Sequence, residues 1–406
     1  MRITTPARAA IVVAALSVIT ACHDDAMTAN PVAPSPPALA VDGDGTWMVN
    51  SLADPGDGVC TNSQCTLREA IGAAQNGEQI TFKQNLTGTI ALTAGELVID
   101  EAVVIEGPGA DRIAVNGQNA SRVVRIGAGP GVTLSGLTIM RGNAPPGEIG
   151  GGLFVDLGGR LTLIGMVVTG NTADKGGGIA SFGALALVGS TVVSNMATDV
   201  GGGVFVGSQV AGFAQLTVRR STISSNSAMT GGGIYLTCLG GCPVTISSST
   251  ITANSATFGG GGLLSYSADV TMFNTIIAGN RAQGVTTGPE SDCHDIGQFQ
   301  SLGFNLTSAG TGCSIAGPTD VVVPALQVFT SVLESIPAAN ASPRPTHALI
   351  ERGYAVDAGY CPGESADQRG FPRPYDDLRM PNALDGCDIG AFEWQPADTK
   401  IKGPKP

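Results

Sequence analysis

Three carboxylates offer the clearest chemistry in this sequence, because they recur at one position of a repeat. Glu148, Asp174 and Asp199 each lie two residues before a cluster of glycines. Stacked repeats would hold them about 4.8 Å apart, where carboxylates repel one another unless a cation lies between them. Hard oxygen ligands suit Ca²⁺, so one hypothesis is a calcium site and another is a catalytic site. We favour a third interpretation, a row of carboxylates directed into water, with Lys175 neutralising part of the charge.

Other ionisable side chains are scarce between residues 130 and 290, and histidine is absent from that part of the sequence. Polysaccharide hydrolysis requires paired carboxylates, and β-elimination requires a base beside calcium-binding carboxylates. The adjacent Arg219 and Arg220 could bind a ligand, but a solvated edge is the simpler interpretation. We therefore expect no catalytic residues, and no cofactor unless the acidic row holds Ca²⁺. A polysaccharide lyase or glycoside hydrolase is the alternative.

An internal repeat predicts the elements that position these side chains. Five twelve-residue units align without gaps, and each ends in asparagine: Asn171, Asn195, Asn226, Asn254 and Asn280. A sixth unit, ending at Asn143, fits with one extra residue. Apolar residues alternate within each unit, as in a β-strand, and a glycine cluster follows each unit.

The length of the repeat indicates the architecture. Successive asparagines are 24 to 31 residues apart, which is enough for about three short strands and their turns. Such a unit cannot bury its own apolar side chains, so successive units must stack with parallel strands. The predicted fold is all-β, a single parallel β-helix in which the asparagine side chains form a hydrogen-bonded structural ladder. A β-propeller is the runner-up, but its blades need about 40 residues each.

The flanks of the repeat differ in pattern. Thr66 and Glu69 have the spacing of a capping box, and apolar residues at helical spacing follow, which predicts a short capping helix near 66–75. Near the other end, charged residues between cysteines are expected to form the buried ion pairs of a cap rather than a catalytic site: Asp357, Asp367, Arg369 and Asp388. The expected segments are the β-helix over 46–290, C-terminal coils and a cap over 291–394, and a disordered tail over 395–406.

The N-terminus resembles the export signal of a bacterial lipoprotein. An apolar run over 9–21, too short to cross a bilayer, ends in small residues before Cys22. The stretch Ile19-Thr20-Ala21-Cys22 resembles a lipobox, which implies removal of a signal peptide over 1–21 and lipidation of Cys22. Residues 22–45 would then be a proline-rich tether. The resemblance implies an exported protein at the outer membrane or cell surface, or in the periplasm. An ordinary secretory signal is the alternative.

Eight further cysteines indicate disulfides, because an even number in an exported protein is typical of them. Their spacing suggests local pairs, although sequence alone does not fix the connectivity: Cys60 with Cys65, Cys238 with Cys242, Cys293 with Cys313, and Cys361 with Cys387. A zinc site is disfavoured, because the three histidines are scattered and no CxxC occurs.

The repeat and its flanks resemble known families. Glycine clusters followed by an apolar residue, with units ending like Val192-Val193-Ser194-Asn195, resemble repeats of polymorphic outer-membrane proteins and the pectin-lyase-like right-handed β-helix superfamily. Cys65-Thr66-Leu67-Arg68-Glu69-Ala70 resembles the N-terminal CSLREA motif, with Thr in place of Ser. Asp388-Ile389-Gly390-Ala391-Phe392-Glu393 resembles part of the C-terminal region called choice-of-anchor Q. The resemblance implies a right-handed β-helix. It selects no activity, because this fold serves adhesins, lyases and hydrolases alike.

These observations lead to one expected function. We expect a monomeric, lipid-anchored envelope protein without enzymatic activity, whose face rich in Ser, Thr, Asn and Gly binds a glycan or a surface protein. The membrane is a partner through the lipid. A net charge of −12 argues against nucleic acid as a partner, because phosphate binding needs clustered Lys and Arg. A structural envelope component without a discrete ligand is a further alternative.

Overall fold

The computed structural model describes residues 45–129, 131–208, 210, 212–295, 298–313, 315, 317–396 and 398. The predicted signal peptide, the lipidation site Cys22 and nearly all of the predicted tether lie outside these residues. Most of the predicted C-terminal tail lies outside them too. None of the helices in the described part is long and apolar enough to cross a membrane.

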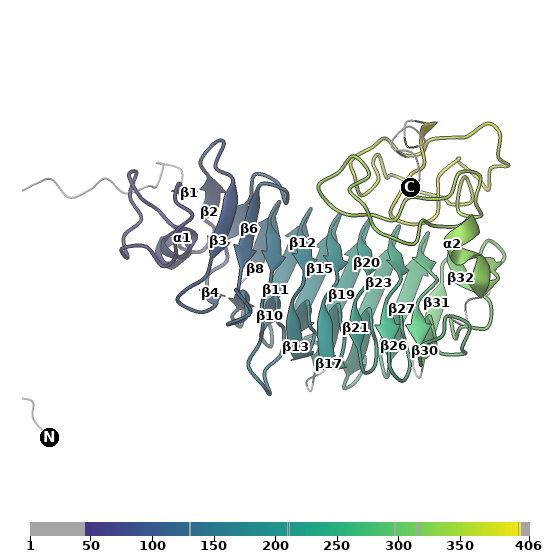
Figure 1. The fold of residues 1–406 in the computed structure, drawn as a ribbon, viewed down its shortest axis with the longest axis horizontal. Helices are drawn as coiled ribbons and strands as arrows, with labels where there is room; N and C mark the ends of the chain where they lie inside the picture. Colours follow the sequence, from purple (N-terminus) through teal and green to yellow (C-terminus); the bar gives the residue numbers. More distant parts are fainter. Residues whose placement is uncertain are drawn as a thin grey trace, which may run out of the picture. The chain divides into compact units, whose positions relative to one another are not determined.

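The chain is a parallel β-solenoid, in which each strand pairs with its counterparts in the turns before and after it (Figure 1). Four sheets result. Sheet I contains β1 Thr46–Val49, β2 Gln79–Phe82, β5 Val104–Glu106, β8 Gly131–Ser135, β11 Arg160–Ile164, β15 Ala184–Val188, β19 Gln215–Arg219, β23 Pro243–Ser247, β27 Asp269–Phe273 and β31 Gln298–Ser301. Sheet II contains β4 Leu97–Ile99, β7 Val124–Ile126, β10 Leu153–Val155, β14 Ile179–Ser181, β18 Val204–Ser208, β22 Ile234–Cys238, β26 Leu263–Ser265 and β30 Cys293–Asp295.

The other two sheets complete each turn. Sheet III contains β3 Gly88–Ala91, β6 Ile113–Asn116, β9 Thr138–Met140, β12 Val167–Thr169, β16 Thr191–Val193, β20 Thr222–Ser224, β24 Thr250–Thr252, β28 Ile276–Ile277, β32 Leu306–Ser308 and β33 Val321–Val323. Sheet IV contains β13 Thr172–Lys175, β17 Met196–Val200, β21 Ser227–Ala228, β25 Ser255–Ala256 and β29 Arg281–Ala282. A typical turn passes through sheets II, I, III and IV in that order.

The interior is built from apolar side chains that stack from turn to turn. The register pairs the second position of the repeat across five turns: Leu161, Leu185, Leu216, Val244 and Val270. All five are buried in one continuous core. The gapless alignment of the five units and the predicted parallel β-helix are therefore confirmed.

A capping helix lies at the N-terminal end of the chain's folded part. Helix α1 spans Leu67–Ala73. The Thr66 side chain accepts a hydrogen bond from the Glu69 backbone N–H, and the Glu69 side chain accepts one from the Thr66 backbone N–H, which is the predicted capping box. Leu67 and Ala70 are buried in the same core as the strands.

All eight cysteines outside the N-terminal region form disulfides. The pairs are the four local ones: Cys60–Cys65, Cys238–Cys242, Cys293–Cys313 and Cys361–Cys387. The longest of these loops separates its cysteines by 26 residues, so each bond stabilises a local turn rather than joining distant turns of the solenoid.

The C-terminal segment, residues 325–398, packs on the last turns of the solenoid in a second core, which includes Ile276, Leu306 and Val323. It begins with a 3₁₀ turn over Ala325–Gln327 and helix α2, Val328–Ser331, and continues as turns and isolated bridges. Two buried ion pairs hold it together: Asp367 with Arg369 at 2.8 Å, and Glu393 with Arg373 at 2.7 Å. The segment therefore contains the expected disulfide, and Asp367 and Arg369 form an ion pair as expected. Asp357 and Asp388, also expected in ion pairs, instead accept hydrogen bonds from the backbone N–H groups of Asp377 and Asp357.

The segment also covers a side of the solenoid. Thr191, Thr222 and Thr250 form one outward column of sheet III. Thr191 donates to the Pro345 carbonyl at 3.0 Å, and Thr222 donates to the Gln368 side chain at 2.6 Å. The segment therefore lies along the outer face of sheet III, as Figure 1 shows.

The turn before sheet II requires glycine, because backbone atoms of the next turn of the solenoid lie very close to it. A Cβ atom on Gly202 would clash with the carbonyl oxygens of Ser227 and Gly232. We expect Gly202→Ala to lower the free energy of unfolding by about 1 to 3 kcal/mol, the usual cost of overpacking, in urea denaturation. Gly131→Ala is the matched control, because its Cβ would meet nothing within 4 Å. Equal midpoints for the two variants would contradict this account.

Candidate functional site

A mostly half-buried stripe of aromatic side chains crosses the outer face of sheet II. It comprises Phe154, Phe182, Phe205, Tyr235 and Tyr266. Successive ring centroids are 5.6, 6.1, 5.9 and 5.7 Å apart, within the range for favourable aromatic pairs. The stripe thus runs from turn to turn, across the strands.

The register of sheet II explains how these rings meet. Phe154, Ala180, Phe205 and Tyr235 occupy one outward column in consecutive turns. The small Ala180 leaves room, and the ring of Phe182, two residues further along the chain, packs between Phe154 and Phe205. The rings therefore occupy two neighbouring columns, with Phe154, Phe205 and Tyr235 in one and with Phe182 and Tyr266 each two residues further along the chain.

The stripe forms the floor of a hollow of about 520 Å³. Phe182, Phe205 and Tyr235 line it on the side of sheet II, together with Gly207 and Thr237. Lys175, Asp199 and Val200 line it from sheet IV, with further contributions from Gly147, Ile149 and Ser208. Phe205 is 5 % exposed whereas Tyr266 is 42 % exposed, so the stripe is buried at Phe205 and open at Tyr266.

The three carboxylates predicted from the repeat lie beside this hollow, each with its own partner. Glu148 forms an ion pair with the buried Arg122 at 2.7 Å. Asp199 lies 3.7 Å from Lys175, and both side chains are about half exposed. They do not gather around one point, since their ligand atoms are not among those within 4.8 Å of one another. The structure therefore places them as a rim of separate polar contacts.

Asp174 is held by hydrogen bonds rather than by an ion pair. It accepts from the backbone N–H of Gly147 at 2.7 Å and from the hydroxyl of Thr198 at 2.8 Å. These two bonds hold the pKa of Asp174 below its usual value. Asp174 is therefore a carboxylate rather than a proton donor near neutral pH.

Tyr235 is the titratable aromatic residue in the hollow. Burial, with smaller contributions from the nearby Tyr266 and Asp199, raises its pKa to about 12. The phenol is therefore neutral at physiological pH and can donate a hydrogen bond to a ligand.

Beyond the stripe, the outward column of Phe205 and Tyr235 continues through Leu264 to His294. The Nδ1 atom of His294 lies 3.0 Å from a Glu290 carboxylate oxygen, but without the angles of a hydrogen bond. This contact is therefore a close electrostatic approach between two residues that do not line the hollow.

The repeat asparagines form a buried ladder of hydrogen bonds. Asn171, Asn195, Asn226 and Asn254 each donate both the backbone N–H and the side-chain amide to the Oδ1 atom of the next asparagine, at 2.9 to 3.0 Å. Asn280 makes the same two bonds to Asp292. Burial raises the pKa of Asp292, and hydrogen bonds from Thr311 and Asn280 oppose the rise.

The sixth unit of the repeat does not join the ladder. Its Asn143 is exposed, and Gly142 donates its backbone N–H to Asn171 instead. The extra residue in that unit moves the asparagine out of register. At the other end, Asp292 continues the ladder although no repeat unit ends there, so neither end was visible in the sequence.

Serine and histidine meet once under the C-terminal segment, at a distance that would suit a catalytic dyad. The Ser224 hydroxyl lies 2.6 Å from Nε2 of His347, and Nδ1 of His347 lies 2.6 Å from the Glu334 carbonyl. Both side chains are almost fully buried, and burial lowers the pKa of His347 to about 4. No substrate can reach the pair, so it joins the segment to sheet III rather than forming a site.

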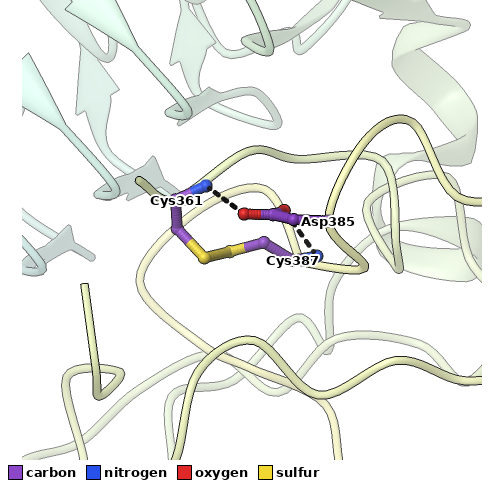
Figure 2. A group of neighbouring side chains, drawn as sticks. All are labelled: Cys361, Asp385 and Cys387. Carbon is purple, nitrogen blue, oxygen red and sulfur yellow. Dashed lines mark hydrogen bonds between the residues drawn. A yellow bond between two sulfur atoms is a disulfide. The ribbon is translucent and has the colours of Figure 1, made fainter. Parts of the chain in front are cut away.

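Cys361, Asp385 and Cys387 bring three candidate metal-ligand atoms within 4.8 Å of one another (Figure 2). Both sulfur atoms are joined in a disulfide. The Asp385 carboxylate accepts hydrogen bonds from the backbone N–H groups of Cys361 and Cys387, at 3.3 and 3.2 Å. The cluster therefore stabilises a loop and offers no thiolate to a metal.

The comparisons with known proteins return one structural likeness. A scan against known protein families finds no match, and a search of curated proteins finds none. Among solved structures, the crystal structure of pectate lyase Pel9A matches with a TM-score of 0.41 and 13 % identity. The match covers 86 % of this chain and 97 % of that one. The fold assignment rests on the strand pairing itself.

The aromatic stripe was missed in the sequence, although a signal was present. In three turns an aromatic residue follows the apolar residue after the glycine cluster: Leu153-Phe154, Val204-Phe205 and Ile234-Tyr235. Alternation along a strand directs the apolar residue inward and the aromatic residue outward. The pattern therefore predicts an outward aromatic column once the inward column is known.

The ladder allows a stability test with an internal control. Asn226→Ala removes the acceptor for the Asn195 backbone N–H, and a buried donor without an acceptor costs about 1–3 kcal/mol. With the lost bond to Asn254, we expect the free energy of unfolding to fall by about 2–4 kcal/mol in urea denaturation. Asn143→Ala changes the exposed asparagine of the same repeat and should leave stability within about 0.5 kcal/mol. Similar losses for both variants would show that the ladder contributes nothing specific.

Proposed function

We propose that this protein is a bacterial envelope protein that binds a glycan along the aromatic stripe of sheet II without cleaving it. The observation that carries the proposal is the continuity of the stripe over the turns from Phe154 to Tyr266. Partly exposed aromatic rings in a continuous patch are typical of interaction surfaces. Sugar rings present flat C–H faces that stack on such side chains.

The direction of the stripe favours a chain-like ligand. Neighbouring strands of a sheet lie about 4.8 Å apart, so each turn of the solenoid offers one further binding position along the stripe. A ligand with repeated units can occupy several positions at once, and each weak contact adds to the same complex. A polysaccharide or the glycan of a surface protein has this form.

Polar groups beside the rings would orient the ligand. Lys175, Asp199 and Thr237 line the hollow with hydrogen-bonding groups, and the neutral phenol of Tyr235 can donate. An apolar floor with a few polar groups at its rim is the usual composition of a small-molecule site. The hydroxyl groups of a sugar fit such a rim.

The composition of the hollow supports binding rather than hydrolysis. Asp199 is the sole carboxylate among the described residues that line it, and it lies near Lys175. Hydrolysis by the usual route needs two carboxylates on opposite sides of the scissile bond. A lyase remains the second candidate, because Lys175 beside Asp199 is the kind of pair that β-elimination could use.

Binding and cleavage can be tested in one experiment on neutral and acidic polysaccharides. We expect retardation in affinity electrophoresis, and no increase in reducing ends or unsaturated products with or without Ca²⁺. Tyr235→Ala and Phe182→Ala should each weaken binding at least tenfold, about 1.4 kcal/mol or more. Tyr354→Ala, which changes an exposed tyrosine in the C-terminal segment, is the control. Product formation that is lost in Lys175→Ala would replace the binding function by a lyase.

The attachment to the membrane is a separate part of the proposal. Cys22 would carry the lipid, and the residues before strand β1 would form a tether between the lipid and the solenoid. We expect the wild-type protein in the membrane fraction of its host and the Cys22→Ser variant in the soluble fraction. A Cys22→Ser variant that stays with the membranes would exclude lipid anchorage at this residue.

A further inference from the structure

The corner between sheets I and III carries two arginines without carboxylate partners. At this corner the chain adopts a left-handed conformation in three consecutive turns, at Gly165, Gly189 and Arg220, with φ values of 61°, 57° and 48°. The register aligns these positions, because each directly follows a set of paired strand residues: Ile164, Val188 and Arg219. Arg220 therefore occupies a position that is glycine in the two preceding turns.

Arg344 of the C-terminal segment lies over the same corner. A Cβ atom on Gly165 would stand 3.3 Å from Nη1 of Arg344. Pro343 and Pro345 flank Arg344 and restrict its backbone. The guanidinium therefore lies directly above the first of the three turns.

The two guanidinium groups share one stretch of chain. Arg344 donates to the Gln368 carbonyl at 2.7 Å, and Arg220 donates to the Ala366 carbonyl at 3.3 Å. The two carbonyl groups are two residues apart in the chain, which spans at most about 7 Å. The two guanidinium groups are thus close enough to repel each other. Burial is the main cause that lowers the pKa of Arg344, and the charge of Arg220 lowers it as well.

The turn between them is open. A Cβ atom on Gly189 would meet no heavy atom within 4 Å, in contrast to Gly165, where Arg344 is in contact. Gly189 lies one turn from each neighbour, so the space above it is flanked by Arg344 on one side and Arg220 on the other. About 9.6 Å, two strand spacings, separates the outer two turns.

Both arginines at this corner have hydrogen-bond donors without acceptors among the described residues. The Nε–H groups of both Arg220 and Arg344 are buried and have no acceptor among the described residues. No carboxylate in that part of the chain lies within 4.0 Å of either guanidinium. Among the carboxylates, Asp367 has the largest effect on the pKa of Arg344, which it raises. Its carboxylate is, however, already paired with Arg369 at 2.8 Å. The charge of Asp111 acts on Arg344 more weakly.

We propose that Arg220 and Arg344 form an oxyanion-binding site over Gly189, which takes a sulfate, phosphate or carboxylate group. Planar guanidinium groups bind such anions through paired N–H donors, and the anion removes the repulsion between the two arginines. Because one arginine belongs to the solenoid and the other to the C-terminal segment, the anion bridges the two and stabilises their contact. The site lies at a different corner from the aromatic stripe and is independent of glycan binding there.

The first test compares anions at constant ionic strength. Inorganic sulfate, inorganic phosphate and glucuronate are titrated separately at millimolar concentration against a chloride background, and the melting temperature is recorded. We expect at least one of them to raise the melting temperature with saturation, as binding to the folded state requires. The three arms distinguish a sulfate, a phosphate and a sugar carboxylate as the source of the anion.

Matched variants separate a specific site from a general salt effect. Arg220→Gln and Arg344→Gln should each abolish the saturable rise, and Arg281→Gln, which changes an exposed arginine on strand β29, should retain it. Sulfate also stabilises folded proteins in general by exclusion from their surface. An equal rise in the wild type and in both arginine variants would therefore overturn the proposal, as would the absence of a saturable rise with all three anions.

A second pair of variants tests the geometry even if the arginine variants fail to fold. Gly189→Asp places a carboxylate in the open space, and Gly189→Asn places an uncharged side chain of the same shape there. Both residues tolerate the left-handed conformation. We expect Gly189→Asp to have the higher melting temperature of the two and to lose the response to added anions. Equal melting temperatures, with the anion response retained in both, would show that the space does not face the arginines.

Discussion

Every turn of this chain must repeat the backbone path of the one before it, because the hydrogen bonds of all four sheets run between turns. This constraint governs the inward positions most strongly. Apolar residues stack on like residues, and the asparagine side chains bond to their copies in the next turn as well as to backbone carbonyls of the turn before. A residue at such a position is therefore selected by its neighbours above and below, rather than by its neighbours in sequence.

Outward side chains are not constrained by the neighbouring turns in this way, and they have different roles on different sheets. On sheet III the column of Thr191, Thr222 and Thr250 bonds to the C-terminal segment. On sheet II the corresponding outward positions carry the aromatic stripe. At the corner between sheets I and III, Arg220 replaces glycine without disturbing the path, at the expense of a left-handed non-glycine residue. Side chains with specific contacts therefore lie at the outward positions of this fold, where the repeat is free to vary.

The same distinction explains what the sequence could predict. Columns such as Leu161 to Val270, and the asparagines, recur at fixed spacing, so simple alignment finds them. The capping helix was also predictable, since Thr66 and Glu69 act within one turn of helix. The partner of Glu148 was not, because Arg122 reaches it from another turn through a side chain that shows no periodicity. Lys175 was expected beside the acidic row, and the structure places it 3.7 Å from Asp199 in the next turn. Arg219 and Arg220, interpreted as a solvated edge, contact Glu364 and Ala366 of a segment that is about 145 residues away in sequence. Arg219 is exposed as expected, but the interpretation was wrong for Arg220, whose Nε atom is buried. A repeat pattern carries no information about a non-repetitive segment that docks on it.

The docked segment also changes which face can bind a ligand. The sequence favoured a face rich in serine, threonine and asparagine, but the asparagines and the column of Ser190, Ser221 and Ser249 are buried. The outward threonines of sheet III already have partners in the C-terminal segment. What sheet II leaves for a ligand is a row of rings with a polar rim, and such a surface gains more from stacking than from hydrogen bonds. Since ring stacking tolerates differences among sugars while a network of hydrogen bonds does not, the glycan binding that we propose would favour a class of glycans that share a repeated ring over one defined oligosaccharide.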